Sequence, residues 1–499
     1  MVKKLSFSLD RLPEVFVSNK DMASTVSKAV QAGRLRKIAS RLYTSNLTEV
    51  PEKIVKRNWY ALLKEYFPDA LITDRTALEN RPAADGSVFI ISAGTRDVVL
   101  PGITFRPRPG PPPLDSDRPF LGGIRLCSAP RAWLENMRPS RGRGGAVSRT
   151  LSKVELEEQL DRLLRQGDEK SLNALRDDAR AISRQIGLEI EFKKLDELIG
   201  AFLGTREAKM ESNVGRARKK GSPYDPERLN LFVALFEELR ALAPDTRPAE
   251  RMSEPAKTHL AFFEAYFSNY IEGTEFLVEE AVNIVFNGFI PKDRPEDAHD
   301  VLGTYRIVSD QKEMARTPRD FDSFVSLLKS RHAGFMEWRP DKRPGQFKTQ
   351  GNQAGSTVFV APDLVLGTLE KGFEIYRGIG PALHRSIFMM LLVSEVHPFA
   401  DGNGRAARIM MNAELVAERE QKIIIPTVYR NNYLSALKAM SHSGKCTAFI
   451  RVLDFAQKYT GAIRWDDFDH ARAELQATNA FMDANEAEDL GFRLVLPSR

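Results

Sequence analysis

The chain has 499 residues, of which 42% are hydrophobic and 28% charged. A chain of this length divides into roughly two to four domains, and its composition excludes a disordered protein. No stretch is apolar enough to span a membrane, and the residues after Met1 lack the apolar segment of a signal peptide. The cysteines, Cys127 and Cys446, form neither a disulfide framework nor a metal motif, so we expect a protein of the reducing cytoplasm without membrane contact.

The net charge of +6 is unevenly distributed along the chain. Residues 1–150 contain 25 Lys and Arg against 14 Asp and Glu, whereas the remaining residues contain 48 against 53. A basic excess over one domain is what a nucleic-acid backbone selects, although a solvated arginine-rich surface gives the same count. Duplex DNA is therefore a candidate partner of the N-terminal part.

Residues 1–50 have the pattern of a small winged helix. A short polar helix ends before Gly33, and strands at 35–38 and 42–44 form a hairpin after it. Four basic residues lie on this hairpin: Arg34, Arg36, Lys37 and Arg41. They can contact phosphates or simply keep the unit soluble. Base contacts would have to come from the polar face of the helix, which carries Thr25, Lys28 and Gln31.

Residues 51–214 predict an α/β regulatory domain with a helical end. The expected elements are a helix at 59–67, strands at 88–92, 97–100 and 103–106, and helices at 151–165 and 171–188. Proline- and glycine-rich composition between 107 and 145 predicts loops, and the basic segment 215–225 predicts a linker.

Residues 226–465 predict a bundle of long helices, followed by a C-terminal extension at 466–499. The expected helices lie at 228–242, 259–270, 274–286, 320–330, 383–396, 405–419 and 433–442. The β-branched run 357–360 interrupts them as a short strand. We therefore expect a multidomain, mainly α fold in which an α/β, winged-helix-like region precedes the bundle.

The most informative stretch is His-Pro-Phe-Ala-Asp-Gly-Asn-Gly-Arg-Ala-Ala-Arg at 397–408, between two predicted helices. The run Gly402-Asn403-Gly404 opens the second helix, so successive N–H groups form an anion-binding concavity at its positive end. Arg405 and Arg408 follow at i and i+3 and can reach separate phosphates. A polyphosphate is the expected ligand.

Two other side chains of this stretch suit chemistry on a phosphate. Asp401 supplies a carboxylate for a Mg²⁺ ion that takes its remaining ligands from water and phosphate oxygens. His397 has a reference pKa near neutrality and is the candidate base for an attacking hydroxyl. The competing interpretation is a plain helix corner with a buried histidine. We favour the functional interpretation, because so many residue types suited to phosphate chemistry fall within so short a stretch.

This stretch resembles the signature of the Fic family, His-x-Phe-x-(Asp/Glu)-Gly-Asn-Gly-Arg-x-x-Arg, at every specified position, and residues 226–465 have the length of a Fic domain. Fic proteins are mostly adenylyltransferases that move AMP from ATP onto a Ser, Thr or Tyr hydroxyl of a protein and release pyrophosphate. Some members transfer phosphocholine, phosphate or UMP instead. A self-modifying enzyme and a homodimer are further expectations from this resemblance.

The resemblance also implies residue roles. His397 would be the general base, Asp401 the Mg²⁺ ligand and Phe399 the buried aromatic that fixes the loop. Asn403 would assist catalysis at the α-phosphate. The nucleotide-binding set would be Gly402, Asn403, Gly404, Arg405 and Arg408.

Upstream, Ser-Asn-Tyr-Ile-Glu-Gly at 268–273 resembles the Ser-x-x-x-Glu-Gly inhibitory helix of many Fic proteins, expected here near 262–273. The resemblance implies that Ser268, Glu272 and Gly273 are inhibitory and that Glu272 pairs with Arg408, which blocks the γ-phosphate position. Ser268 and Glu272 are one helical turn apart, and a carboxylate near an arginine competes with phosphate. An ordinary helix with a surface glutamate is the alternative.

Weaker likenesses concern the rest of the chain. Residues 357–360 resemble the family's flap, a hairpin edge that aligns an extended target segment, and 294–300 resemble a segment that we interpret as structural. Tyr429 and Tyr433 either line the base and ribose of the nucleotide or belong to the core. Residues 33–43 look like the wing of AbiEi-type antitoxins and transcription regulators, although little room precedes Gly33 for two full helices.

Two functional hypotheses follow. The first is a self-inhibited protein adenylyltransferase with an N-terminal regulatory region. The second is a DNA-binding, antitoxin-like regulator whose Fic domain senses nucleotides or binds partners. The intact His397 favours the enzyme, because a binding module needs no base at that position.

Overall fold

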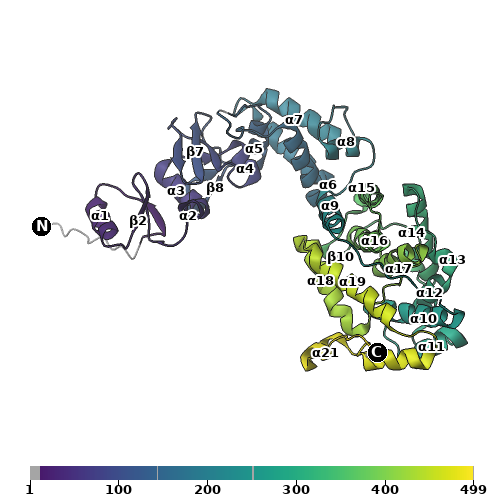
Figure 1. The fold of residues 1–499 in the computed structure, drawn as a ribbon. Helices are drawn as coiled ribbons and strands as arrows, with labels where there is room; N and C mark the ends of the chain where they lie inside the picture. The colour runs from purple at the N-terminus through teal and green to yellow at the C-terminus, as the bar shows by residue number, and fades with distance from the viewer. Residues whose placement is uncertain (1–11, 143, 250–251, 498–499) are drawn as a thin grey trace. The chain divides into compact units, whose positions relative to one another are not determined.

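A computed structural model describes residues 12–142, 144–249 and 252–497 (Figure 1). The chain forms two compact units that divide between Lys219 and Lys220. Helices dominate both units, and small sheets occur mainly in the first, so the expected multidomain, mainly α fold is confirmed. None of the described helices is both long and apolar enough to cross a membrane.

The first unit begins with a three-stranded antiparallel sheet of order β1-β3-β2. Its elements are β1 (Val15–Val17), α1 (Ala23–Gln31), β2 (Arg36–Ala39) and β3 (Leu42–Thr44). The predicted helix and hairpin are confirmed, and β1 was not expected. Among the described residues only one helix precedes the hairpin, so this region lacks the helix pair of a full winged helix.

A six-stranded mixed sheet of order β6-β7-β5-β4-β9-β8 follows. The central strand β5 (Ser87–Ile91) is buried at every position and runs parallel to β7 (Ile103–Arg108). The other strands are β4 (Leu71–Ile72), β6 (Val98–Leu100), β8 (Arg118–Pro119) and β9 (Arg125–Leu126), and the helices beside them are α2 (Pro51–Arg57), α3 (Trp59–Tyr66) and α4 (Asp74–Glu79). The predicted helix at 59–67 and the three predicted strands are confirmed.

The first unit ends in helices α5 (Ala129–Asn136), α6 (Lys153–Ser183), α7 (Glu189–Phe202) and α8 (Asn213–Lys219). The two helices predicted at 151–165 and 171–188 correspond to the two parts of α6, which a kink at Asp168, where φ is 66°, separates. Two expectations were wrong in part. Helix α5 lies within the stretch expected to form loops, and residues 215–219 of the expected linker belong to α8, where Arg218 bonds Asp161 at 3.0 Å.

The second unit is a helical bundle with one small hairpin (Figure 1). Its helices are α9 (Pro226–Ala241), α10 (Glu254–Ile271), α11 (Val278–Asn287), α12 (Pro295–Ser309), α13 (Gln311–Met314), α14 (Phe321–Phe335), α15 (Val365–Tyr376), α16 (Ala382–Val396), α17 (Asn403–Ala417), α18 (Arg430–Ser443), α19 (Cys446–Ala462), α20 (Phe468–Ala477) and α21 (Ala484–Leu490). The hairpin joins β10 (Gln353–Ala354) to β11 (Thr357–Val358).

The core of this bundle is built around α16, in which every residue except Arg385 is buried. A helix that is buried on all faces lies inside a domain, and α17 packs directly beside it. The loop between them, residues 397–402, is therefore anchored on two buried helices. That rigid support positions the candidate site.

Candidate active site

The loop between α16 and α17 contains two residues in the left-handed backbone conformation. His397 ends α16 with φ 51° and ψ 58°, a conformation that few residues other than glycine adopt, and Gly402 caps α17 with φ 73°. A Cβ atom on Gly402 would lie 2.9 Å from the Phe335 ring, so glycine is required here for space as well as for backbone geometry.

Phe399 anchors the middle of the loop in the core. Its ring is fully buried, as expected, and stacks on His332 with 3.6 Å between ring centroids. Burial lowers the pKa of His332 to about 4, so this imidazole is neutral. Its Nδ1 accepts from the Gly345 N–H at 2.9 Å, which leaves Nε2 to donate to the Asp401 carbonyl at 2.9 Å. Sequence reasoning gave His332 no role, because its partners are distant along the chain.

Asn403 fastens the loop from the other side. Its Oδ1 accepts from the Phe399 N–H at 2.8 Å, and its Nδ2 donates to the Phe399 carbonyl at 2.9 Å. Both ends of the side-chain amide therefore hold the loop in this structure. The contact with an α-phosphate that we expected from Asn403 stays a prediction, for which its backbone N–H remains in place at the start of α17.

His397 is held as a neutral imidazole with one free nitrogen. Its Nδ1 lies 3.2 Å from the Ser394 carbonyl, an oxygen that can only accept, so Nδ1 carries the proton and Nε2 presents a lone pair. Burial lowers the pKa of His397 to about 4, and the positive charge of Lys348 acts in the same direction. The ring of Phe359, just after the hairpin, stacks on the imidazole at 3.6 Å and fixes its plane.

The anion-binding concavity at the start of α17 is covered by a carboxylate. A Cβ atom on Gly404 would lie only 2.2 Å from Oε1 of Glu272, so the absent side chain leaves the space that this carboxylate fills. A negative group is favoured there by the helix dipole and by unpaired N–H groups. The position expected to take phosphate is thus taken by a side chain of the same protein.

Arg408 connects α17 to the end of α10. It is 5% exposed, and its guanidinium donates to Glu272 Oε1 at 2.7 Å, to Ser268 Oγ at 2.9 Å and to the Ser268 carbonyl at 2.8 Å. Gly273, with φ 91°, ends the turn that presents Glu272. The structure therefore brings together the three residues of the upstream motif and the second arginine of the loop motif.

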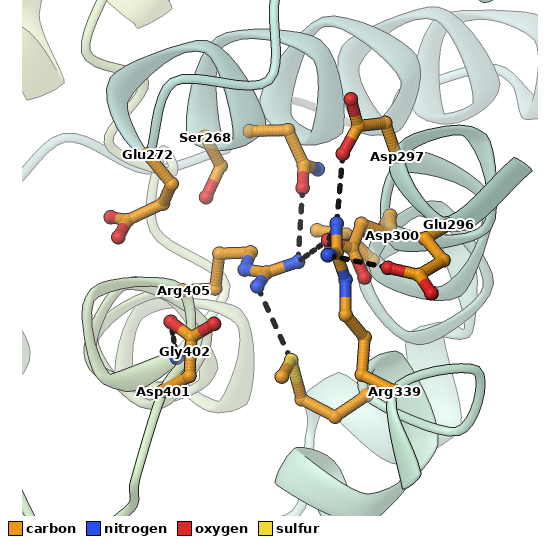
Figure 2. Close-up of polar contacts among 12 residues, drawn as sticks. Ser268, Glu272, Glu296, Asp297, Asp300, Arg339, Asp401, Gly402 and Arg405 are labelled. Atoms are coloured by element: carbon orange, nitrogen blue, oxygen red, sulfur yellow. Dashed lines mark hydrogen bonds and ion pairs between the residues drawn. The ribbon is translucent and has the colours of Figure 1, made fainter. Parts of the chain in front are cut away.

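Arg405 differs from the expectation. Its side chain points away from Asp401 and Gly402 and toward Asp300 of α12 (Figure 2). The ion pair measures 3.0 Å with both side chains buried, and Arg339 bonds the same carboxylate at 2.9 Å. Arg405 does not face the concavity together with Arg408, because Asp300 attracts it into the core. Asp300 lies in the segment 294–300 that we interpreted as structural, and only its acidic character could have indicated this contact.

Comparison with known proteins identifies the domain that carries this loop. Residues 322–415 match the model of the Fic/DOC family. The chain carries a Fic domain. Two relatives named protein adenylyltransferase Fic, from Drosophila willistoni and Drosophila ananassae, are each 35% identical, over 246 and 255 residues. The matches cover 47% and 48% of this chain and the same shares of those proteins, so the chain spans about half the length of the curated relatives it matches.

Among solved structures, a Fic-domain-containing signaling protein from Bacteroides thetaiotaomicron is 16% identical to the chain, with a TM-score of 0.37. The match covers 49% of this chain and 97% of that one. Fic-1 from C. elegans is 17% identical with a TM-score of 0.36, over 66% of this chain and 95% of its own.

The Fic domain offers one carboxylate oxygen for a metal ion. Asp401 Oδ1 accepts from the Gly402 N–H at 2.7 Å, and its second oxygen has no protein hydrogen bond in the described part of the chain. No cluster of three or more His, Cys, Asp or Glu able to hold a metal occurs among the described residues. This arrangement fits Mg²⁺, which commonly uses one or two carboxylates together with water and substrate phosphates.

A hairpin lies where the flap was expected, with Thr357–Val358 of the predicted run 357–360 as its second strand, and its role as a flap stays a prediction. Ala354 pairs with Thr357 in the antiparallel β10–β11 ladder, and Val358 is 65% exposed. Of the two tyrosines with open alternatives, Tyr433 is 1% exposed and belongs to the core, whereas Tyr429 is half-buried and packs against Phe455.

The basic residues expected on the N-terminal hairpin divide into two pairs. Arg36 donates to the Glu49 carbonyl, and Arg41 donates to the Ser18 carbonyl at 2.9 Å. Arg34 and Lys37 are exposed, and within the described residues no hydrogen bond or ion pair engages their side chains. On α1, Lys28 and Gln31 are exposed and Thr25 is half-buried.

Proposed function

We propose that this protein is a self-inhibited protein adenylyltransferase that moves AMP from ATP to a Ser, Thr or Tyr hydroxyl of a target protein. The observation that carries the proposal is the neutral His397 beside an anion-binding helix start, in a domain that matches the Fic/DOC family. The two Drosophila relatives named adenylyltransferases support the same reaction. ATP and a hydroxyl-bearing protein are then the substrates, and the protein itself is a further target.

The reaction is an in-line substitution at the α-phosphorus. The target hydroxyl oxygen forms a bond to this phosphorus, the bond from it to the α,β-bridging oxygen breaks, and pyrophosphate leaves. His397 Nε2 takes the hydroxyl proton, which requires the neutral imidazole that burial favours. The N–H groups of Asn403 and Gly404 stabilise phosphate oxygens, so positioning and charge stabilisation dominate catalysis.

Asp401 is the residue that would hold Mg²⁺, through the oxygen that Gly402 does not use. When bound, the ion neutralises phosphate charge. The remaining positive charge comes from Arg408, the guanidinium that lies beside the concavity. In our proposal Arg405 binds Asp300 and thereby supports the start of α17, instead of binding a phosphate.

Self-inhibition follows from the position of Glu272. Its carboxylate pairs with Arg408 and fills the space over Gly404, so a γ-phosphate and Glu272 compete for the same groups. A nucleotide that binds against this competition has its α-phosphate out of line with the hydroxyl. Removal of the carboxylate should therefore raise transfer to the target and to the protein itself.

The decisive experiment incubates the full chain with ATP labelled at the α-phosphate, and in parallel with UTP, GTP and CDP-choline. Mass spectrometry locates the modified residue. We expect AMP transfer from ATP, a strong increase for Glu272→Gly, and loss of transfer for His397→Ala with an unchanged circular dichroism spectrum. Wild-type transfer by His397→Ala, or no transfer by Glu272→Gly from any donor, would overturn the proposal.

A second candidate function is duplex DNA binding by the N-terminal part, favoured by the basic excess of residues 1–150 and by the exposed Arg34 and Lys37. One helix precedes the hairpin among the residues from 12 onward, which supports phosphate contact more than base reading. Fluorescence anisotropy of the full chain with a labelled duplex at low salt tests it. Absence of binding would leave this region as a protein-interaction or regulatory part.

A further inference from the structure

Lys348 is a buried cation without a counter-charge. It is 6% exposed, and in the described part of the chain no carboxylate lies within ion-pair distance of its ammonium. Its Nζ instead donates to Asn352 Oδ1 at 2.6 Å and contacts the Val396 carbonyl at 3.4 Å. Burying an ammonium group against neutral oxygens is unfavourable, so a lysine retained in such a place needs a reason other than stability.

The segment that carries Lys348 forms hydrogen bonds with the loop on both sides of His397. Besides the contact with Val396, the backbone N–H of Lys348 donates to the Pro398 carbonyl at 2.8 Å. Asn352, which Lys348 holds, donates to the Phe399 carbonyl at 2.9 Å. These bonds fix the residues before and after the strained His397, whose φ is 51°.

The charge of Lys348 also acts on the imidazole. The charged groups that influence His397 are Lys348, which favours its neutral form, and Glu272 and Asp401, which favour its protonated form. Arg228 is the charged neighbour of Lys348, and burial together with this neighbour lowers the pKa of Lys348 to about 8. Lys348 therefore remains mostly charged near neutral pH and loses its proton above pH 8.

We propose that Lys348 is a positioning residue of the transfer reaction, which holds the loop of His397 and keeps a positive charge beside this imidazole. The inference rests on the proposed function for its kinetic effect but not for its effect on the imidazole. Lys348 also connects the flap hairpin to the loop of His397, because only four residues separate Lys348 from β10. A target segment that binds the flap hairpin thereby meets a base whose orientation is already set.

The test compares Lys348→Met, Lys348→Arg and the control Lys342→Met, whose side chain is 39% exposed and paired with Asp341. Transfer from ATP is measured in the Glu272→Gly background, and imidazole titration is followed by NMR of the full chain with ¹³C-labelled histidine. A His397→Ala sample assigns the signal. Met keeps the length of the lysine stem without its charge, and Arg keeps a charge that cannot be lost in this pH range.

For Lys348→Met we expect kcat to fall about tenfold or more while KM for ATP stays within about twofold, because orientation and not nucleotide binding is lost. The His397 signal should titrate at a higher pH than in wild type. Lys348→Arg should retain most of the transfer and remove the decline of the wild type above pH 8. Lys342→Met should behave as wild type in every measurement.

An unchanged pKa of His397 in Lys348→Met would overturn the inference. It would also be overturned if Lys348→Arg lost as much kcat as Lys348→Met and its transfer still declined above pH 8 as in the wild type. If Lys348→Met does not fold, the rate of transfer by Lys348→Arg above pH 8 is the deciding measurement. If no variant transfers any nucleotide, the proposed function fails, while the NMR titration still tests the effect of Lys348 on His397.

Discussion

Removal of the Glu272 carboxylate should tighten ATP binding by a predictable factor. Glu272 forms one charged hydrogen bond to Arg408 at 2.7 Å, and nucleotide binding has to break it. Such a bond contributes about 1.5–3 kcal/mol, which corresponds to about ten- to hundredfold in affinity. Arg408 keeps its two bonds to Ser268 in the variant, so the guanidinium should remain in place for the γ-phosphate.

Isothermal titration calorimetry with ATP and Mg²⁺ measures this change in affinity. The chain with Glu272 and the Glu272 variants all carry His397→Ala, so that no nucleotide is turned over. Glu272→Gly should show the lower Kd, and Glu272→Gln an intermediate value, because it removes the charge and retains the size of the side chain. Glu275→Gly, an exposed glutamate three positions later, is the control and should leave Kd unchanged. Equal Kd values with and without the Glu272 carboxylate would refute the competition argument.

Three further predictions concern other parts of the protein. Asp401→Ala should lower transfer and raise the Mg²⁺ concentration needed for half-maximal rate; an unchanged Mg²⁺ requirement would contradict its role as ligand. Burial lowers the pKa of His332 and His397 to about 4, so the unfolded chain binds more protons than the folded chain between pH 6.5 and 4. The free energy of unfolding of the Fic domain should therefore decrease as the pH is lowered through this window. Denaturant unfolding should show a loss of about 2 kcal/mol per histidine at pH 5. A stability that is flat from pH 7 to 5 would argue against these pKa values. If the N-terminal part binds DNA, Arg34→Ala and Lys37→Ala should each reduce the salt slope by about one unit or less, and Arg36→Ala and Arg41→Ala by less, because the latter side chains bond backbone carbonyls.

The elements that sequence patterns predicted are those whose cause is local. Helix α16 contains a continuous apolar run from Ile387 to Val393, and the β2–β3 hairpin is closed by two residues, so both follow from short-range patterns. Strands β4 and β9 were not predicted, because each has two residues and exists only through pairing with distant segments. Helix α15 was hidden by its glycines. A Cβ atom on Gly367 would lie 2.2 Å from the Pro223 carbonyl and one on Gly372 2.3 Å from Leu392, so these glycines serve close packing and lower the helical signal.

The same distinction applies to the candidate site. The turn at Gly402 and the burial of Phe399 follow from one continuous motif and were predictable from it. The contacts of His332 and Lys348 with the loop cross many residues of sequence and leave no local pattern. A motif therefore specifies the groups that meet the ligand, whereas the residues that hold those groups depend on how the whole bundle packs.

The two arginines of the motif illustrate why residue type alone does not assign a role. Each meets a carboxylate, but Asp300 beside Arg405 is 3% exposed and is shared with Arg339, whereas Glu272 beside Arg408 is 28% exposed. Opening the first pair would leave an uncompensated charge in the core, which is strongly unfavourable. Opening the second releases a carboxylate to water and frees a guanidinium for phosphate. In our proposal only the Arg408 pair therefore exchanges its partner for a nucleotide, and self-inhibition acts through the end of α10, where Glu272 lies.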